Sequence, residues 1–299
     1  MRTFDLYDLN NELIVSAFKN KNIEVYDVDN RQNRTLICFS GNGLFAVNDE
    51  ETFRKTIIED SRYEWMNLCK HKKIKMYYSQ IIFVRDIFKQ WYVNGINSEC
   101  TSIDDLLSLL QSMIPENNTI VTVGNSAGGY MAMLVGIKLK ANSIFSFSGQ
   151  FSIWDQLEQA PLLQKYKNDI SRNKYYDISQ LINEYDFYKE NTSLFHFYPG
   201  KCDWDIFQVK HCPKKKNVYL LAFDRDTHGV TVIPYSLPYI LTTRNDKMGY
   251  LCRMFENRLI DPLEFLKCVL RKKNFMVYFI KKQIDKLRMK IWVLTHPKT

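Results

Sequence analysis

Short apolar runs alternate with helix-compatible segments along the middle of the chain. Runs rich in β-branched and aromatic residues, which predict strands, lie at 35–40, 80–86, 119–123, 143–149, 193–200 and 217–226. Between two of them, the stretch TSIDDLLSLLQSMIP opens with Ser102 in a capping-box-like pattern and repeats apolar residues at helical spacing. This alternation predicts βαβ units, a mostly parallel sheet and an α/β fold.

Other segments of the chain depart from this alternation of strands and helices. FDLYDL (4–9) and NIEVYDV (22–28) are predicted to open the sheet as an antiparallel strand pair, and residues 49–70 are predicted to form a helix. Residues 151–192 are polar and aromatic-rich, which favours a small inserted cap. From residue 245 onward the pattern is mainly helical.

The net charge is concentrated at the C-terminal end. The chain carries +8, and from Asn245 onward thirteen Lys and Arg face five Asp and Glu, so residues 1–244 are neutral overall. Apolar residues of this end recur every three or four positions with Lys and Arg between them: Met276, Ile280, Ile284, Leu287, Ile291 and Leu294. We therefore expect an α/β domain over 1–244 and a basic helical extension over 245–299.

That charge distribution bears on the partners. A neutral body argues against a nucleic-acid partner, because such enzymes carry the basic patch on the folded body. A basic amphipathic helix favours contact with anionic lipid or a protein partner, and the alternative is a helix packed on the body with solvated cations.

Composition indicates a folded protein of a reducing compartment. The chain is 45% hydrophobic and 14% aromatic, enough for the core of one large domain. Seven scattered cysteines without a CxxC pair argue against a disulfide framework and a zinc ribbon, so no metal is expected. Acidic residues occupy the place of a signal-peptide core, and no run approaches the ~20 apolar residues of a membrane span. We expect a cytoplasmic location, peripheral at the inner face of the membrane if the extension binds lipid.

Small residues crowd the junction between the strand TIVTV and the next helix. Gly124, Asn125, Ser126, Ala127 and Gly128 fit G-x-S-x-G, in which a tight turn strains the serine and projects its hydroxyl. The helix that follows directs its free N–H groups and positive dipole at the same point. The motif predicts Ser126 as a nucleophile, the Ala127 N–H as an oxyanion donor and Asn125 as a substrate contact; the alternative is a turn that serves packing alone.

A serine nucleophile needs a base and an orienting acid, which in this fold class follow in the order Ser, acid, His. His228 lies just beyond the run VYLLAF, where Gly229 permits a tight loop, and we predict it as the base rather than a solvated loop histidine. The acid is expected after the preceding strand, where GKCDWD offers Asp203 and Asp205. Only one of them can face His228. We favour Asp205, since Asp203 is closer to the strand end and suits a turn.

A second oxyanion donor is expected from the glycine-rich loop CFSGNGLFA. Gly41, Asn42 and Gly43 are the candidates, and the Asn42 amide is favoured. An ordinary βα turn is the alternative explanation for these glycines.

The loop FVRDIFKQWYVNG follows the next strand at the same edge of the sheet. Arg85, Asp86, Trp91 and Tyr92 suit a sugar, because aromatic faces stack on C–H surfaces and charged groups bond hydroxyls. An aromatic cluster with a buried ion pair explains the same residues equally well.

Together these motifs, FSGNG, GNSAGG, GKCDWD and DTHG, resemble those of the α/β-hydrolase superfamily over residues 30–245. The VRD…WY loop combined with GNSAGGY is similar to hydrolase-fold proteins encoded with bacterial capsule and surface-polysaccharide genes. Some of those proteins are esterases, and others are O-acetyltransferases that take the acetyl group from acetyl-CoA. The oxyanion loop departs from the common His-Gly-Gly form.

The resemblance implies a serine enzyme acting on O-acyl groups of a glycan, with no required cofactor and acetyl-CoA as the candidate acyl donor. Ser126 would be acylated, with His228 as base and Asp205 or Asp203 as its partner. Two other hypotheses remain open: a lipase or thioesterase with an apolar cap, and a catalytically silent scaffold that binds partners.

Overall fold

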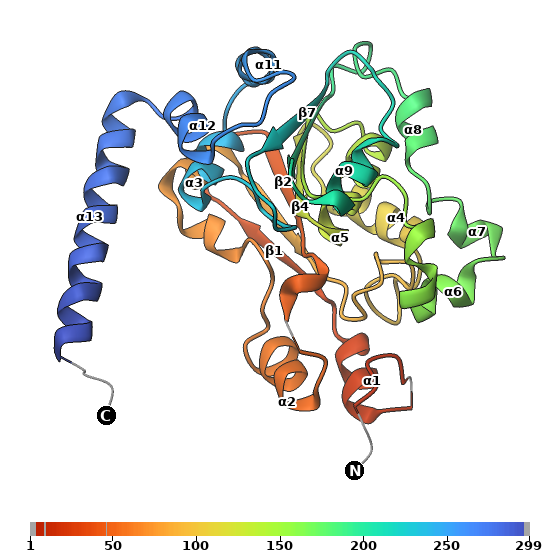
Figure 1. The fold of residues 1–299 in the computed structure, drawn as a ribbon. Helices are drawn as coiled ribbons and strands as arrows, with labels where there is room; N and C mark the ends of the chain where they lie inside the picture. Colours follow the sequence, from red (N-terminus) through yellow and green to blue (C-terminus); the bar gives the residue numbers. More distant parts are fainter. Residues whose placement is uncertain (1–3, 9, 46, 296–299) are drawn as a thin grey trace.

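The computed structural model describes residues 4–8, 10–45 and 47–295, with the side chains of 285–287 and 289–295 left out of account. Its centre is a seven-stranded sheet in the order β1-β3-β2-β4-β5-β6-β7 (Figure 1). The strands are β1 (Ile23–Asp27), β2 (Arg34–Phe39), β3 (Gln80–Val84), β4 (Thr119–Asn125), β5 (Ser143–Phe147), β6 (Ser193–Pro199) and β7 (Val218–Phe223). All neighbours from β3 to β7 are parallel, and β1 is antiparallel to β3. The chain thus has the predicted α/β-hydrolase fold.

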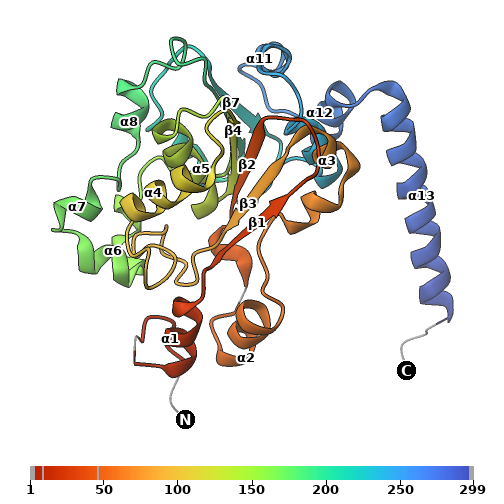
Figure 2. The same ribbon diagram turned by 180° about the vertical axis from the view of Figure 1, so that it is seen from behind.

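Two layers of helices cover the sheet, as Figures 1 and 2 show from opposite sides. One face is covered by α4 (Ile103–Met113), α5 (Ala127–Lys138), α6 (Pro161–Tyr166) and α8 (Ser179–Glu184), and α1 (Glu12–Lys19) lies beyond the strand ends. The other is covered by α3 (Lys72–Tyr77), α10 (Leu237–Ile240), α11 (Asn245–Met254) and α12 (Pro262–Val269). The sheet is therefore buried on both faces, which explains why its central strands are continuous apolar runs.

Aromatic side chains form a row across three central strands. Phe145, Phe195 and Tyr219 are register partners on β5, β6 and β7. The rings of Phe145 and Phe195 stack with centroids 5.3 Å apart, as do those of Phe195 and Tyr219. We call these three residues the aromatic row; cross-strand aromatic pairs of this kind stabilise one register of the sheet.

The predicted opening strand pair is wrong. Residues 4–8 form turns, in which the Asp5 and Asp8 carboxylates accept hydrogen bonds from the backbone N–H groups of Tyr7 and Asn10. Such local bonds give the backbone an alternative to a strand. Asn11 then caps α1, and β1 pairs with β3 instead.

The helix predicted over 49–70 is also interrupted. It consists of α2 (Glu50–Phe53), the π-helical η2 (Arg54–Glu59) and, after a break, the 3₁₀ helix η3 (Met66–Lys70). Ser61 and Trp65 have positive φ angles of 41° and 63°, which a continuous helix cannot contain. The break matters for function because it places Glu64 beside the predicted nucleophile turn.

The candidate cap, 151–192, contains η4 (Trp154–Gln159), α6, α7 (Ile170–Asn173) and α8. Its apolar side chains, including Leu163 and Ile182, are buried in the same cluster as those of α5. This segment packs beside α4 and α5 in both views of the ribbon (Figures 1 and 2). It therefore forms part of the main core.

The division of the chain at 244/245 needs correction. Met248 and Phe265 of α11 and α12 are fully buried in the cluster that contains Phe223, so these helices belong to the body. Only α13 (Lys272–Thr295) projects from it (Figure 1). Among the residues with described structure, no helix is both long and apolar enough to cross a membrane. All seven cysteines are free thiols.

Candidate active site

Ser126 lies in a sharp turn between β4 and α5. Its backbone has φ 54° and ψ −123°, a strained conformation for a residue with a side chain. The turn requires small neighbours: a Cβ on Gly124 would lie 1.9 Å from the Gly128 carbonyl oxygen, and one on Gly128 would lie 2.3 Å from that of Phe39. The turn thus has the strain and the close backbone approaches that the G-x-S-x-G motif predicts.

Ser126, His228 and Asp205 form one hydrogen-bonded chain. Ser126 Oγ lies 2.9 Å from His228 Nε2, and His228 Nδ1 lies 2.9 and 3.1 Å from the two Asp205 carboxylate oxygens. Asp205 is 2% exposed, whereas the His228 side chain is 34% exposed and open to solvent. A buried carboxylate on Nδ1 leaves Nε2 free to accept the serine proton.

The structure distinguishes the two candidate acids. Both lie in the first turn of α9 (Asp203–Val209), where Asp205 is turned inward onto His228 and Asp203 is exposed. The favoured residue, Asp205, is the one paired with the histidine.

The loop that carries His228 is fixed by two residues after β5 that sequence analysis missed. Gly229 has φ 126°, a conformation that favours glycine. Ser148 Oγ donates to the Gly229 carbonyl at 2.8 Å and accepts from its N–H at 3.2 Å. Gln150 in turn donates to the Ser148 carbonyl. The only signal for these residues was their place at the C-terminal end of the predicted strand 143–149, at the edge where the nucleophile turn lies.

Other histidines serve the fold. His196 is 1% exposed and bonded to Ser146 Oγ at 3.1 Å. Burial lowers the pKa of His196 to about 4, so it is neutral at physiological pH. His71 accepts a hydrogen bond at the start of α3, and His296 lies outside the described residues. Of the histidines that the structure describes, His228 is the one bonded to Ser126.

The predicted oxyanion donors divide into two groups. Ala127 and Asn42 are the first residues of α5 and of the 3₁₀ helix η1 (Asn42–Leu44), where backbone N–H groups have no acceptor in a preceding turn. Gly43 follows in η1 and is exposed. The Gly41 N–H instead donates to Glu64 Oε2 at 2.7 Å, so the prediction of Gly41 as a donor is wrong.

Glu64 joins the oxyanion loop to the nucleophile turn. Besides the Gly41 N–H, it accepts a long hydrogen bond from Asn125 Nδ2 at 3.4 Å. Burial is the largest effect on the carboxyl and raises its pKa, with the bonds from Gly41 and Asn125 acting in the opposite direction. Asn125 Oδ1 is buried without a partner. The Asn125 Nδ2 group is thus directed at Glu64, and a substrate contact by Asn125 stays a prediction.

The charged pair of the VRD…WY loop is structural. Arg85 is 3% exposed, and its guanidinium donates to the Asn22 side chain and to the carbonyls of Ile57 and Arg62. Asp86 is 5% exposed and accepts backbone N–H bonds from its own loop. Neither side chain has a group left for a sugar, so both substrate-contact predictions are wrong. The sequence could not reveal the role of Arg85, because its partners Asn22, Ile57 and Arg62 are distant in the chain.

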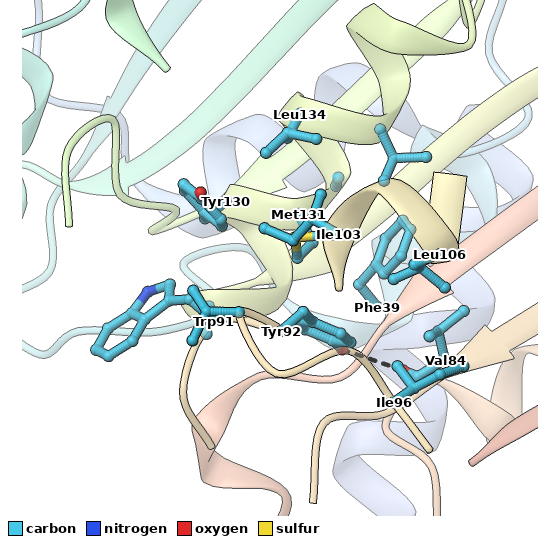
Figure 3. Packing of buried hydrophobic residues seen from close by; sticks show 14 of the residues in the cluster. Phe39, Val84, Trp91, Tyr92, Ile96, Ile103, Leu106, Tyr130, Met131 and Leu134 are labelled. Atoms are coloured by element: carbon cyan, nitrogen blue, oxygen red, sulfur yellow. Dashed lines mark hydrogen bonds between the residues drawn. The ribbon is translucent and has the colours of Figure 1, made fainter. Parts of the chain in front are cut away.

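The aromatic pair of this loop is buried too, as Figure 3 shows. The Tyr92 ring is inaccessible, and its hydroxyl donates to the Ser40 carbonyl at 2.7 Å. Trp91 is 7% exposed and donates from Nε1 to Gln150 Oε1 at 2.9 Å. The prediction of sugar stacking on these rings is wrong; the aromatic-cluster alternative describes them, with separate partners for Arg85 and Asp86 in place of an ion pair.

Comparisons with known proteins give likenesses of fold. No family model and no curated protein sequence matches the chain. The capsule O-acetyltransferase of Neisseria meningitidis serogroup A is 13% identical, over 68% of this chain and 84% of that one, with a TM-score of 0.46. An S-formylglutathione hydrolase from Agrobacterium tumefaciens is 13% identical (79% and 93% covered, TM-score 0.44). Esterase B from Lactobacillus rhamnosis is 13% identical (67% and 75% covered, TM-score 0.39).

Proposed function

We propose that this protein is a serine-dependent acyl-transfer enzyme that acts on O-acyl groups of a bacterial cell-surface polysaccharide or its precursor. The observation that carries the chemistry is the chain of hydrogen bonds from Ser126 through His228 to the buried Asp205. A serine hydroxyl bonded to an imidazole that a carboxylate orients is the arrangement that activates serine as a nucleophile. The glycan substrate is supported by the resemblance of the GNSAGGY and VRD…WY motifs to those of hydrolase-fold proteins encoded with bacterial capsule and surface-polysaccharide genes.

The reaction follows from these parts. His228 Nε2 takes the Ser126 proton as Oγ attacks the acyl carbonyl, and the charge of Asp205 stabilises the resulting imidazolium. The N–H groups of Ala127 and Asn42 hold the oxyanion that develops on the carbonyl oxygen. His228 then returns the proton to the leaving atom, which is the ester oxygen of an O-acyl substrate or the sulfur of acetyl-CoA, and the acyl group remains on Ser126.

Hydrolysis and transfer differ in the group that leaves during acylation, a sugar hydroxyl or the thiol of CoA, and in the acceptor that resolves the acyl-enzyme. Water resolves the acyl-enzyme in an esterase, whereas a sugar hydroxyl does so in an acetyltransferase whose acyl donor is acetyl-CoA. His228 is the base in both cases, because each acceptor must lose a proton as it attacks.

The first experiment tests the nucleophile. Intact mass after fluorophosphonate treatment should show one adduct on the wild type and none on Ser126→Ala, whereas a folded wild type without adduct would refute the proposal. Acetyl release from an O-acetylated polysaccharide, or acetyl transfer from acetyl-CoA to the deacetylated polymer, would then support the glycan substrate. Activity confined to short apolar esters or thioesters would replace it with a lipase or thioesterase function.

A further inference from the structure

Helix α13 stands apart from the rest of the molecule. It has 24 residues and leaves the body after α12, extending along one side of it in both ribbon views. Its first turns contact the body through Tyr278, whose ring lies 5.2 Å from that of Tyr235. At 1.5 Å per residue the helix is about 36 Å long, much longer than this contact requires.

The apolar side chains of α13 lie mostly away from that contact. Met276, Ile280 and Ile284 follow one another at four-residue intervals and therefore share one side of the helix. Tyr278 falls between these positions, on the side facing Tyr235. We define the apolar stripe as the exposed apolar residues among the α13 side chains that the structure describes, which are 39–53% accessible: Met276, Val277, Phe279, Ile280 and Ile284. The body leaves this stripe uncovered.

Cations border the apolar stripe. Lys272 and Lys281 are exposed near its two edges, and Lys273 and Arg288 are exposed along the same helix. A hollow of about 670 Å³ at the root of α13 adds positive charge, since it is lined by Lys73, Arg244, Lys247 and Arg271. Asp246 also lines it and pairs with Arg244 at 2.7 Å. Burial, Arg271 and Lys247 lower the pKa of Lys73, as expected where cations gather.

We propose that α13 is a docking helix for an anionic lipid surface, in which the apolar stripe enters the headgroup boundary and the bordering lysines bind lipid phosphates. An apolar face flanked by cations is the pattern of helices that lie in a membrane interface. A second copy of this chain is a poorer occupant, because two such helices would bring like charges together. This inference does not depend on the proposed reaction, so its test needs no substrate.

Binding of the full-length protein to phospholipid vesicles tests the proposal. We expect sedimentation with phosphatidylcholine vesicles that contain about one third phosphatidylglycerol, and little with phosphatidylcholine alone. Raising the salt from about 0.1 M to about 1 M should weaken binding strongly, because the Debye length falls from ~10 Å to ~3 Å.

Two double variants separate charge from apolar contact. Lys272→Gln/Lys281→Gln should weaken binding about thirtyfold, because each lost cation weakens binding to an anionic surface about fivefold. Ile280→Ser/Ile284→Ser should weaken it at least about tenfold.

Matched changes elsewhere serve as controls. Lys210→Gln/Lys214→Gln removes two exposed lysines outside α13, and Ile58→Ser/Ile170→Ser removes two exposed isoleucines, 37% and 80% accessible. Both controls should bind vesicles within about twofold of the wild type.

Four results would overturn the proposal, and the first three concern binding. They are equal binding to neutral vesicles, equal loss in the control variants, and binding of inorganic phosphate or glycerol 1-phosphate without binding of vesicles. A native mass that halves in Ile280→Ser/Ile284→Ser would also overturn it, since the stripe would then be covered by a second copy. An unchanged Tm in thermal unfolding shows that each variant is folded.

Discussion

Replacing Asp205 by Asn removes the negative charge under His228 while keeping the shape of the side chain. Unit charges 2.9 Å apart attract by about 6 kcal/mol at an effective dielectric constant of ~20. Because the His228 side chain is 34% exposed, solvent screens part of this attraction, and we take about 4 kcal/mol as the loss when the imidazolium forms. That corresponds to a fall in kcat of about 10³-fold.

The assay is turnover of p-nitrophenyl acetate together with the rate of fluorophosphonate labelling. Both should fall in Asp205→Asn, with little change in KM, because the charge acts on the transition state. Asp203→Asn is the matched control, since it makes the same change at an exposed residue in the same turn of α9. Thermal unfolding of both variants checks that the fold is intact.

Two outcomes would refute this reasoning. The first is an Asp205→Asn enzyme within about tenfold of the wild type, which would mean that the carboxylate does not stabilise the imidazolium. The second is an equal loss in Asp203→Asn, which would mean that either aspartate can supply the charge.

Three further predictions concern the surroundings of the triad. Gly41→Ala would place a Cβ 2.4 Å from the Asn125 carbonyl oxygen and should lower kcat at least about tenfold. In the control Gly43→Ala the Cβ meets nothing within 4 Å, so this variant should retain most of the wild-type kcat, and equal effects would contradict the loop geometry. Because the pKa of Glu64 is raised in the folded protein, protonated Glu64 stabilises the fold at low pH, and this stability is lost as the pH rises through the raised pKa. The Tm of Glu64→Gln should therefore gain on that of the wild type between pH 4 and pH 8, and parallel Tm curves would oppose this. Tyr92→Phe leaves a buried carbonyl without its donor and should destabilise the protein by about 1–3 kcal/mol in urea unfolding, with unchanged KM; a raised KM would restore the sugar-binding role.

The parts of the site that the sequence predicted have local signals. The conformation of Ser126 requires small neighbours two positions on either side, and Gly229 marks the tight loop of His228. The choice between the acids needed the structure, because α9 begins at Asp203 itself and helical rotation, rather than strand alternation, decides which carboxylate turns inward.

The parts that sequence missed depend on distant contacts. Glu64 reaches Gly41 only because Ser61 and Trp65 break a helix that the local pattern predicts as continuous. The VRD…WY loop has the composition of a sugar site. It is buried against partners such as Gln150, which lie far away in the chain, so the local sequence does not show the burial. Composition describes what a loop can bind, whereas burial decides whether a ligand can reach it.

The aromatic row helps to set the relative positions of the catalytic acid and base. Asp205 follows β6 and His228 follows β7, so the height of one relative to the other depends on the register of these two strands. A slip by one residue would turn Phe195 and Tyr219 to the opposite faces of the sheet and lose their stacking. Loops above the sheet can therefore lengthen or change during evolution without altering the spacing of acid and base, and substrate range can diverge while the catalytic centre stays in place.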